Sequence, residues 1–142
     1  ETGKPFLGIC LGMQLLMEKS LEFGESKGLS IVEGEVINFS PHSYKNDFYS
    51  VPQIGWNKLL KKEVSWKTSL LDSNKDEDFM YFVHSFYAKP KNDKDILSYS
   101  EYGNITYCSS LKKENVTGMQ FHPEKSGKNG IKVYLNLKKS IN

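Results

Sequence analysis

The sequence predicts an α/β fold, and two observations carry this prediction. The second half is rich in short β-branched and aromatic runs, of which "FMYFVHSFYA" (residues 79–88) is the strongest strand signal. Helical spacings of apolar residues flank the strands, in "LGMQLLMEKSLEF" (residues 11–23) and in "GIKVYLNLKKSI" (residues 130–141). No internal repeat or domain boundary is visible, so we expect residues 1–142 to form one domain.

The first half of the chain opens on the apolar run "PFLGIC" (residues 5–10), which is typical of a fully buried strand in a parallel sheet. The next apolar residues are spaced as in a helix that continues to Leu21. A short strand, "GEVINF" (residues 34–39), precedes a polar loop that contains His42. The segment "VPQIGWNKLLKK" (residues 51–62) is expected to start extended, with proline and glycine as breakers.

The second half adds a hairpin and a last strand. The segments "DILSYSEY" and "NITYCSSL" are expected to pair around Gly103, and "NVTGMQFHPEKS" (residues 115–126) predicts a strand that runs into a His-Pro-Glu turn. The final helix is expected to place Ile131, Tyr134 and Leu135 on one face, with lysines near its end.

Composition narrows the class of protein. No apolar run approaches the roughly 18 residues of a membrane span and no signal-peptide pattern opens the chain, so we expect a cytoplasmic protein without a membrane partner. Two cysteines, Cys10 and Cys108, cannot make a disulfide framework. All 19 basic residues are lysines, which counts against nucleic-acid binding. The sequence has no Cys/His cluster with metal-ligand spacing, and we expect neither a metal nor a cofactor.

The motif Gly8-Ile9-Cys10-Leu11-Gly12 has the form of a nucleophile elbow, in which a strand turns sharply into a helix. The glycines are expected to remove side chains that would clash at the turn. The helix N-terminus is expected to lower the pKa of the Cys10 thiol, and nearby backbone N–H groups to hold an oxyanion. The alternative is a core cysteine in a glycine-containing strand, and this stretch alone does not decide between the two.

A cysteine nucleophile needs a base, and the chain offers three histidines. His42 lies in a polar loop and His84 inside a strand, whereas His122 follows an apolar strand and is two residues from Glu124. A turn at this point would let the carboxylate fix the tautomer of the imidazole. The alternative for His122 is an ordinary loop histidine, and its distance in sequence from Cys10 does not test the pairing.

Taken together, "PFLGICLGMQ" and "GMQFHPEKSG" resemble the motifs of the class I (triad-type) glutamine amidotransferases, which hydrolyse the side-chain amide of glutamine and pass ammonia to a synthase. "VPQIGWN" and "YFVHSFYA" are similar to the glutaminase subunit of imidazole glycerol phosphate synthase, in histidine biosynthesis. The similarity covers essentially the whole chain. It implies a flavodoxin-like sheet with a nucleophile elbow.

The resemblance also implies that the family's N-terminal α/β units are missing, with the glycine-rich loop that supplies a second oxyanion donor. We therefore expect an N-terminally truncated chain with unpaired strand edges, poorly stable and weakly active alone.

The resemblance implies a role for each matching position. The catalytic residues are Cys10 as nucleophile, His122 as general base and then acid, and Glu124 as orienting carboxylate. The residues expected to bind glutamine are Gly12, Gln14, Glu22, His84, Ser85 and Phe86. The oxyanion donor is the backbone N–H of Leu11. The residues expected at the partner interface and ammonia gate are Gln53, Trp56, Tyr81 and Lys125. Without the resemblance, the two aromatic residues of this last group would read as core residues.

The resemblance implies a heterodimer with a (β/α)8 cyclase subunit, which uses the ammonia to make imidazole glycerol phosphate and AICAR. The glutaminase is expected to idle until that partner is loaded. Two positions depart from the family: Gln53 stands where a histidine is usual, and Phe86 where a tyrosine is usual. Gln53 keeps an alternative open, a paralogous glutaminase that feeds amidation of a surface-polysaccharide or flagellin sugar. A catalytically inactive partner subunit is the other alternative.

Overall fold

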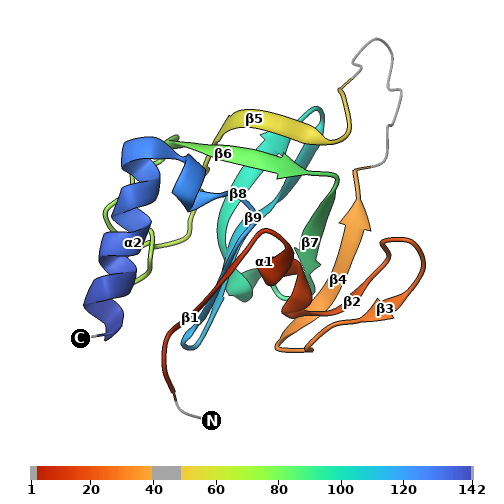
Figure 1. The fold of residues 1–142 in the computed structure, drawn as a ribbon, viewed down its shortest axis with the longest axis horizontal. Helices are drawn as coiled ribbons and strands as arrows, with labels where there is room; N and C mark the ends of the chain where they lie inside the picture. Colours follow the sequence, from red (N-terminus) through yellow and green to blue (C-terminus); the bar gives the residue numbers. More distant parts are fainter. Residues whose placement is uncertain (1–2, 40–48, 142) are drawn as a thin grey trace.

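The computed structural model describes residues 3–39 and 49–141. Figure 1 shows strands in the middle of the molecule, with one long helix at one side and a small hairpin at the opposite side. The first sheet has the order β1 (Phe6–Ile9), β10 (Val116–Met119), β9 (Ile105–Lys113) and β8 (Ile96–Tyr102). The second has the order β3 (Ser26–Lys27), β2 (Met17–Ser20), β4 (Val32–Asn38) and β7 (Phe86–Pro90). A separate ribbon is made of β5 (Gln53–Lys58) and β6 (Phe79–His84).

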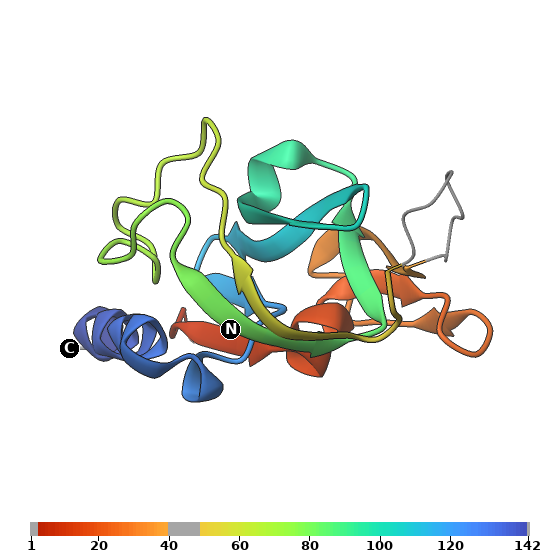
Figure 2. The same ribbon diagram turned by 90° about the horizontal axis from the view of Figure 1, so that it is seen from above.

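The helical elements are α1 (Leu11–Leu15), α2 (Gly127–Ile141) and two 3-10 turns, η1 (Asp93–Asp95) and η2 (Pro123–Lys125). The view from above shows the β5–β6 ribbon curving across the molecule from the α2 side toward the β2–β3 side (Figure 2). Among the residues that the structure describes, no helix is long and apolar enough to cross a lipid bilayer. His42 lies outside the described residues.

Strand β1 pairs in parallel with β10, as the α/β prediction requires, with Gly8 opposite Gly118. It forms an end of its sheet, because β10 is its only neighbour among the described strands. The expectation of a fully buried strand is wrong: Phe6 is 48% exposed. The prediction that this strand has an unpaired edge is confirmed among the described strands.

The helix after Cys10 is shorter than expected. It ends at Leu15, and the residues from Met17 onward form β2 instead of continuing the helix. The reason is non-local: β2 pairs in parallel with β4 and antiparallel with β3, and these ladders satisfy its backbone groups. Helical spacing in the sequence cannot report such a pairing.

The predicted strand over residues 79–88 is broken at Ser85. Its first part, β6, pairs with β5, whereas its second part, β7, pairs with β4 in another sheet. The hairpin of β8 and β9 is confirmed, with Tyr102 opposite Ile105.

The final helix is confirmed, and Ile131, Tyr134 and Leu135 share one face of it as predicted, although this face is exposed. Ile131, Tyr134 and Leu135 are 57%, 37% and 54% exposed. The buried face instead carries Gly130 and Val133. A Cβ added to Gly130 would lie 1.8 Å from the carbonyl oxygen of Pro123, so glycine at this position allows the helix backbone to approach η2 closely.

Two clusters of buried residues form the core. One is rich in aromatic rings and includes Phe39, Phe82, Tyr107 and Phe121. The other packs Met13 of α1 against the second sheet. The elbow lies where β1 enters α1, so the core on both sides fixes its position.

Candidate active site

Cys10 lies between β1 and α1 in a sharp turn. Its backbone has φ 51° and ψ −106°, in the positive-φ region that costs a non-glycine residue about 1–3 kcal/mol. The backbone N–H of Cys10 donates to the carbonyl oxygen of Met119 on β10, at 2.7 Å, which holds the turn against the sheet. The strained geometry fits the predicted elbow.

The two glycines of the motif have different roles. A Cβ on Gly8 would lie 2.7 Å from the backbone carbon and oxygen of Gly12, so the turn requires glycine at position 8. A Cβ on Gly12 would meet nothing within 4 Å. The expectation that both glycines relieve a clash is therefore correct for Gly8 and wrong for Gly12, which borders open space.

The sulfur of Cys10 is half-buried between β6 and the segment after β10. It donates to the carbonyl oxygen of Val83 at 3.8 Å and accepts from Nε2 of Gln120 at 3.6 Å. Burial raises the pKa of the thiol, although hydrogen bonds from the Leu11 backbone and from Gln120 lower it in part. The expectation of a lowered pKa is wrong on balance, because the burial of the sulfur outweighs these two hydrogen bonds.

The turn after β10 brings His122 and Glu124 together, as predicted. Nδ1 of His122 lies 2.5 Å from Oε1 of Glu124, and the backbone N–H of His122 donates to the carbonyl oxygen of Tyr81 at 2.9 Å. Nε2 of His122 is buried without a hydrogen-bond partner in the described structure, so it is not bonded to the sulfur of Cys10. The charges of Glu124 and Lys125 act on the pKa of the Cys10 thiol in opposite directions: the first raises it and the second lowers it.

Gln14 points into the core behind the elbow. Its Nε2 donates to the carbonyl oxygen of Phe86 at 3.0 Å and to Oε1 of Gln120 at 3.1 Å. Gln120 was not among the predicted residues, and its side chain is completely buried. The sequence carries no local signal for it, because its importance depends on the contact with Gln14 far earlier in the chain.

His84 is buried and also contacts Phe86. Nδ1 of His84 lies 2.7 Å from the carbonyl oxygen of Phe86, and Nε2 lies 3.1 Å from the carboxamide oxygen of Gln53. Burial lowers the pKa of His84 to about 4, so the ring is neutral at pH 7. Ser85, which follows, is half-buried, and its carbonyl oxygen accepts from the Phe39 backbone at 3.0 Å.

Gln53 is buried rather than exposed at an interface, with 3% of its surface accessible. The same end of its carboxamide that faces His84 lies 2.9 Å from the hydroxyl of Tyr107. A neutral imidazole has one ring proton, and the carbonyl oxygen of Phe86 accepts it, so Nε2 of His84 needs a donor. A half-turn of the Gln53 carboxamide presents its NH2 group to both neighbours. Direct contact of Gln53 with a partner protein does not fit this burial.

The other expected interface residues are accessible. Trp56 is 56% exposed and packs edge-on against Tyr81, with 5.9 Å between ring centroids. Lys125 is exposed.

Glu22, which was expected to bind glutamine, lies in the turn between β2 and β3 and not on a helix. Its backbone N–H donates to Ser20 Oγ at 3.2 Å. Among the described residues, Glu22 has no hydrogen bond to the residues around Cys10.

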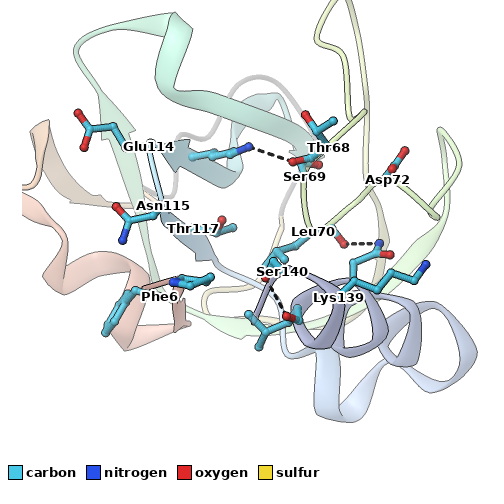
Figure 3. A pocket seen from close by; sticks show the side chains of 14 residues that line it. Phe6, Thr68, Ser69, Leu70, Asp72, Glu114, Asn115, Thr117, Lys139 and Ser140 are labelled. Carbon is cyan, nitrogen blue, oxygen red and sulfur yellow. Dashed lines mark hydrogen bonds between the residues drawn. The ribbon is translucent and has the colours of Figure 1, made fainter. Parts of the chain in front are cut away.

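A cavity of about 340 Å³ lies elsewhere, between the start of β1, residues 68–72 and the end of α2 (Figure 3). None of the predicted site residues lines it. Cys108 is also outside the site: it is buried in β9, and burial raises the pKa of its thiol strongly. This agrees with a structural role for the second cysteine.

The family described as "Glutamine amidotransferase class-I" matches residues 1–139. Two relatives carry the name "Imidazole glycerol phosphate synthase subunit HisH". The one from Aquifex aeolicus is 48% identical over 139 residues, which are 98% of this chain and 62% of the relative. The one from Caldanaerobacter subterraneus is 46% identical over 143 residues, which are 99% of this chain and 64% of the relative. The chain thus spans less than two thirds of the length of these relatives.

Two solved structures share the fold. PurLQS from Thermotoga maritima superposes with a TM-score of 0.69 at 16% identity, over 99% of this chain and 63% of that one. A glutamine amidotransferase from Thermotoga maritima superposes with a TM-score of 0.58 at 21% identity, over 95% of this chain and 46% of that one. At these identities the likeness concerns the fold alone, and it confirms the predicted fold class.

Proposed function

Because the chain belongs to the class-I glutamine amidotransferase family, we propose that it hydrolyses glutamine to glutamate and ammonia, with Cys10 as nucleophile. The observation that carries the proposal is the pairing of His122 with Glu124, beside a cysteine in a strained turn. His122 is oriented through Nδ1, and its buried Nε2 is free to exchange a proton with a reacting group. We further propose that residues 1–142 act as a single domain.

The reaction follows from these roles. The sulfur of Cys10 attacks the side-chain amide carbon of glutamine while His122 takes the thiol proton. The oxyanion that forms on the amide oxygen accepts from the backbone N–H of Leu11. His122 then returns the proton to the leaving nitrogen, which departs as ammonia and leaves a thioester. Water, deprotonated by His122, attacks the thioester and releases glutamate and the free thiol.

The raised pKa of the Cys10 thiol has a consequence for this sequence of steps. A thiol with an ordinary pKa is already mainly protonated at pH 7, and burial makes the thiolate of Cys10 rarer still. The nucleophile therefore rests as a thiol, and attack depends on proton transfer to His122. This supports a glutaminase that is slow at rest.

We propose that the ammonia goes to a (β/α)8 cyclase subunit in a cytoplasmic heterodimer. The support is that relatives at 46–48% identity are named as subunits of imidazole glycerol phosphate synthase. The surface proposed to meet the cyclase includes Trp56 and Tyr81, whose ribbon also contacts Cys10 and His122. Gln53 is proposed to act from behind this surface, through His84, because it is buried.

The test is glutamate release from glutamine, measured with and without a cyclase subunit and its nucleotide ligand. We expect strong stimulation by the loaded cyclase and no activity in Cys10→Ala. Cys108→Ala is the matched control and should keep the activity. Activity that depends on Cys10 but is not stimulated by the cyclase would indicate that the ammonia goes to a sugar-amidation enzyme instead. Complete inactivity of the unsubstituted protein under all these conditions would contradict the proposed function.

A further inference from the structure

Among the described residues, the side chain of Gln120 has two hydrogen-bond partners, and both belong to the elbow and its helix. Its Oε1 accepts from Nε2 of Gln14 at 3.1 Å, and its Nε2 donates to the sulfur of Cys10 at 3.6 Å. The side chain is completely buried, and the backbone N–H donates to Ser109 at 2.9 Å, which fixes the residue on the sheet. A buried carboxamide with no access to water depends on such partners.

The orientation of the Gln120 carboxamide follows from its neighbours. The carbonyl oxygen of Phe86 can only accept, so Gln14 must present its NH2 group there. The same NH2 group reaches Gln120, which must therefore present its oxygen to Gln14. The NH2 group of Gln120 is left facing Cys10. The carbonyl oxygen of Phe86 thus determines, through Gln14 and Gln120, that the sulfur of Cys10 faces a hydrogen-bond donor.

We propose that Gln120 is a positioning residue for the nucleophile: held in one orientation by Gln14, it donates a hydrogen bond to the sulfur of Cys10 and stabilises the thiolate. This rests on the proposed function of Cys10 as nucleophile. A thiolate has no proton to donate, so a fixed donor favours it over the thiol. The bond also holds the sulfur beside the segment that follows β10, in which His122 comes two residues after Gln120.

The other groups around the sulfur are known, so the effect of Gln120 can be isolated. The carbonyl oxygen of Val83 on β6 accepts from the thiol, and the backbone N–H of Leu11 stabilises the thiolate. On η2, the charge of Glu124 disfavours the thiolate and that of Lys125 favours it. A change at Gln120 leaves these four groups in place.

The experiment measures the rate at which iodoacetamide alkylates Cys10 as a function of pH in the full chain, with mass spectrometry to separate Cys10 from Cys108. In Gln120→Leu we expect the midpoint to rise by about one pH unit, which is about tenfold slower alkylation at a fixed pH below the midpoint. Gln120→Glu should raise it further, because a carboxylate faces the sulfur. Asn136→Leu removes a buried carboxamide on α2 and should leave the midpoint unchanged.

Gln14→Leu should raise the midpoint by less, and adding it to Gln120→Leu should have no further effect, because its action passes through Gln120. Midpoints of Gln120→Leu and Gln120→Glu equal to that of Asn136→Leu would overturn the proposal. If neither Gln120 variant folds, the unsubstituted protein still provides a test. The side-chain NH2 resonances of Gln120 must then titrate with the midpoint of Cys10, and their failure to do so would also overturn it.

The alkylation rates do not depend on glutamine hydrolysis, which separates the two proposals. A shifted midpoint in a protein that never releases glutamate would count against the proposed function and leave the hydrogen bond standing. Glutamine hydrolysis with an unmoved midpoint would remove only the role of Gln120.

Discussion

Nδ1 of His122 lies 2.5 Å from Oε1 of Glu124, across a 3-10 turn that begins at Pro123. The proline restricts the backbone just where the two side chains must converge. The contact leaves Nε2 of His122 as the nitrogen available for proton transfer.

Replacing the carboxylate tests this orientation. Glu124→Gln should lower kcat for glutamine hydrolysis by about 100-fold or more, with little change in KM, because the amide no longer holds the imidazolium that forms during the reaction. Glu63→Gln, at an exposed position, is the matched control and should keep kcat. Steady-state glutamate release measures both. A Glu124→Gln enzyme with unchanged kcat would show that Glu124 does not orient the base.

The buried ring of His84 predicts a pH dependence of stability. Its pKa is lowered from 6.5 to about 4, so the unfolded chain binds a proton more readily than the folded one between these values. The contribution of the neutral His84 ring to the free energy of unfolding is fully present above pH 6.5 and should fall by about 3 kcal/mol as the pH falls to 4. Urea unfolding of His84→Gln, whose side chain does not titrate, should lack this part of the slope. Parallel slopes in the two proteins would contradict a neutral His84.

The two glycines of the elbow should respond differently to alanine. Gly8→Ala should lower the free energy of unfolding by about 1–3 kcal/mol, because the new methyl group collides with the backbone of Gly12. Gly12→Ala should leave stability unchanged or raise it by up to about 1 kcal/mol, since alanine is the better helix former. It should nevertheless raise KM for glutamine if the open space beside it receives the substrate. Urea titrations and initial rates distinguish these outcomes, and equal stabilities of the two variants would refute the packing argument.

Asp78 ties α2 to the loop before β6. Its Oδ2 accepts from Lys132 at 3.1 Å, from Asn74 at 3.1 Å and from the Lys75 backbone at 3.0 Å. Asp78→Asn should therefore lower the free energy of unfolding at pH 7 by about 1–3 kcal/mol.

Burial alone would raise the pKa of Asp78, but the hydrogen bonds from the Lys75 backbone, Lys132 and Asn74 lower it below 3.8 overall. The carboxylate contributes its stability above pH 3.8 and loses it as the pH falls through the lower folded-state value. The deficit of Asp78→Asn should accordingly shrink below pH 3.8. Glu77→Gln, which removes an exposed ion pair with Lys58, should change stability by less than about 0.5 kcal/mol. A larger loss in Glu77→Gln than in Asp78→Asn would contradict this ranking.

The parts of the site that are built from a few consecutive residues were predictable from the sequence. The elbow at Cys10 and the turn from His122 to Glu124 each span a few residues, so local motifs indicated them, and the family resemblance favoured them over a core cysteine and a loop histidine. The aromatic pair of Trp56 and Tyr81 came only with the family resemblance, since each residue alone would read as core.

The errors arose where distant segments meet. Helical spacing continued past Leu15, but pairing of β2 with β4 determined the structure there. Gln53 reads as a surface glutamine until β6 and β9 close around it. Gln120 looks like a strand residue of no special kind, and its importance depends on Gln14, which lies 106 positions earlier in the chain. No local pattern in a single sequence contains these contacts.

The edge of β6 that faces away from β5 fixes the spacing between the nucleophile and the base. Tyr81 accepts from the backbone of His122 and Val83 accepts from the sulfur of Cys10, so two alternate carbonyls of one strand hold the base and the nucleophile. Two strand residues set these attachments about 6.6 Å apart. A one-residue insertion or deletion between them would turn one carbonyl to the opposite edge. Evolution can therefore substitute the residues at these positions far more freely than it can insert or delete residues between them.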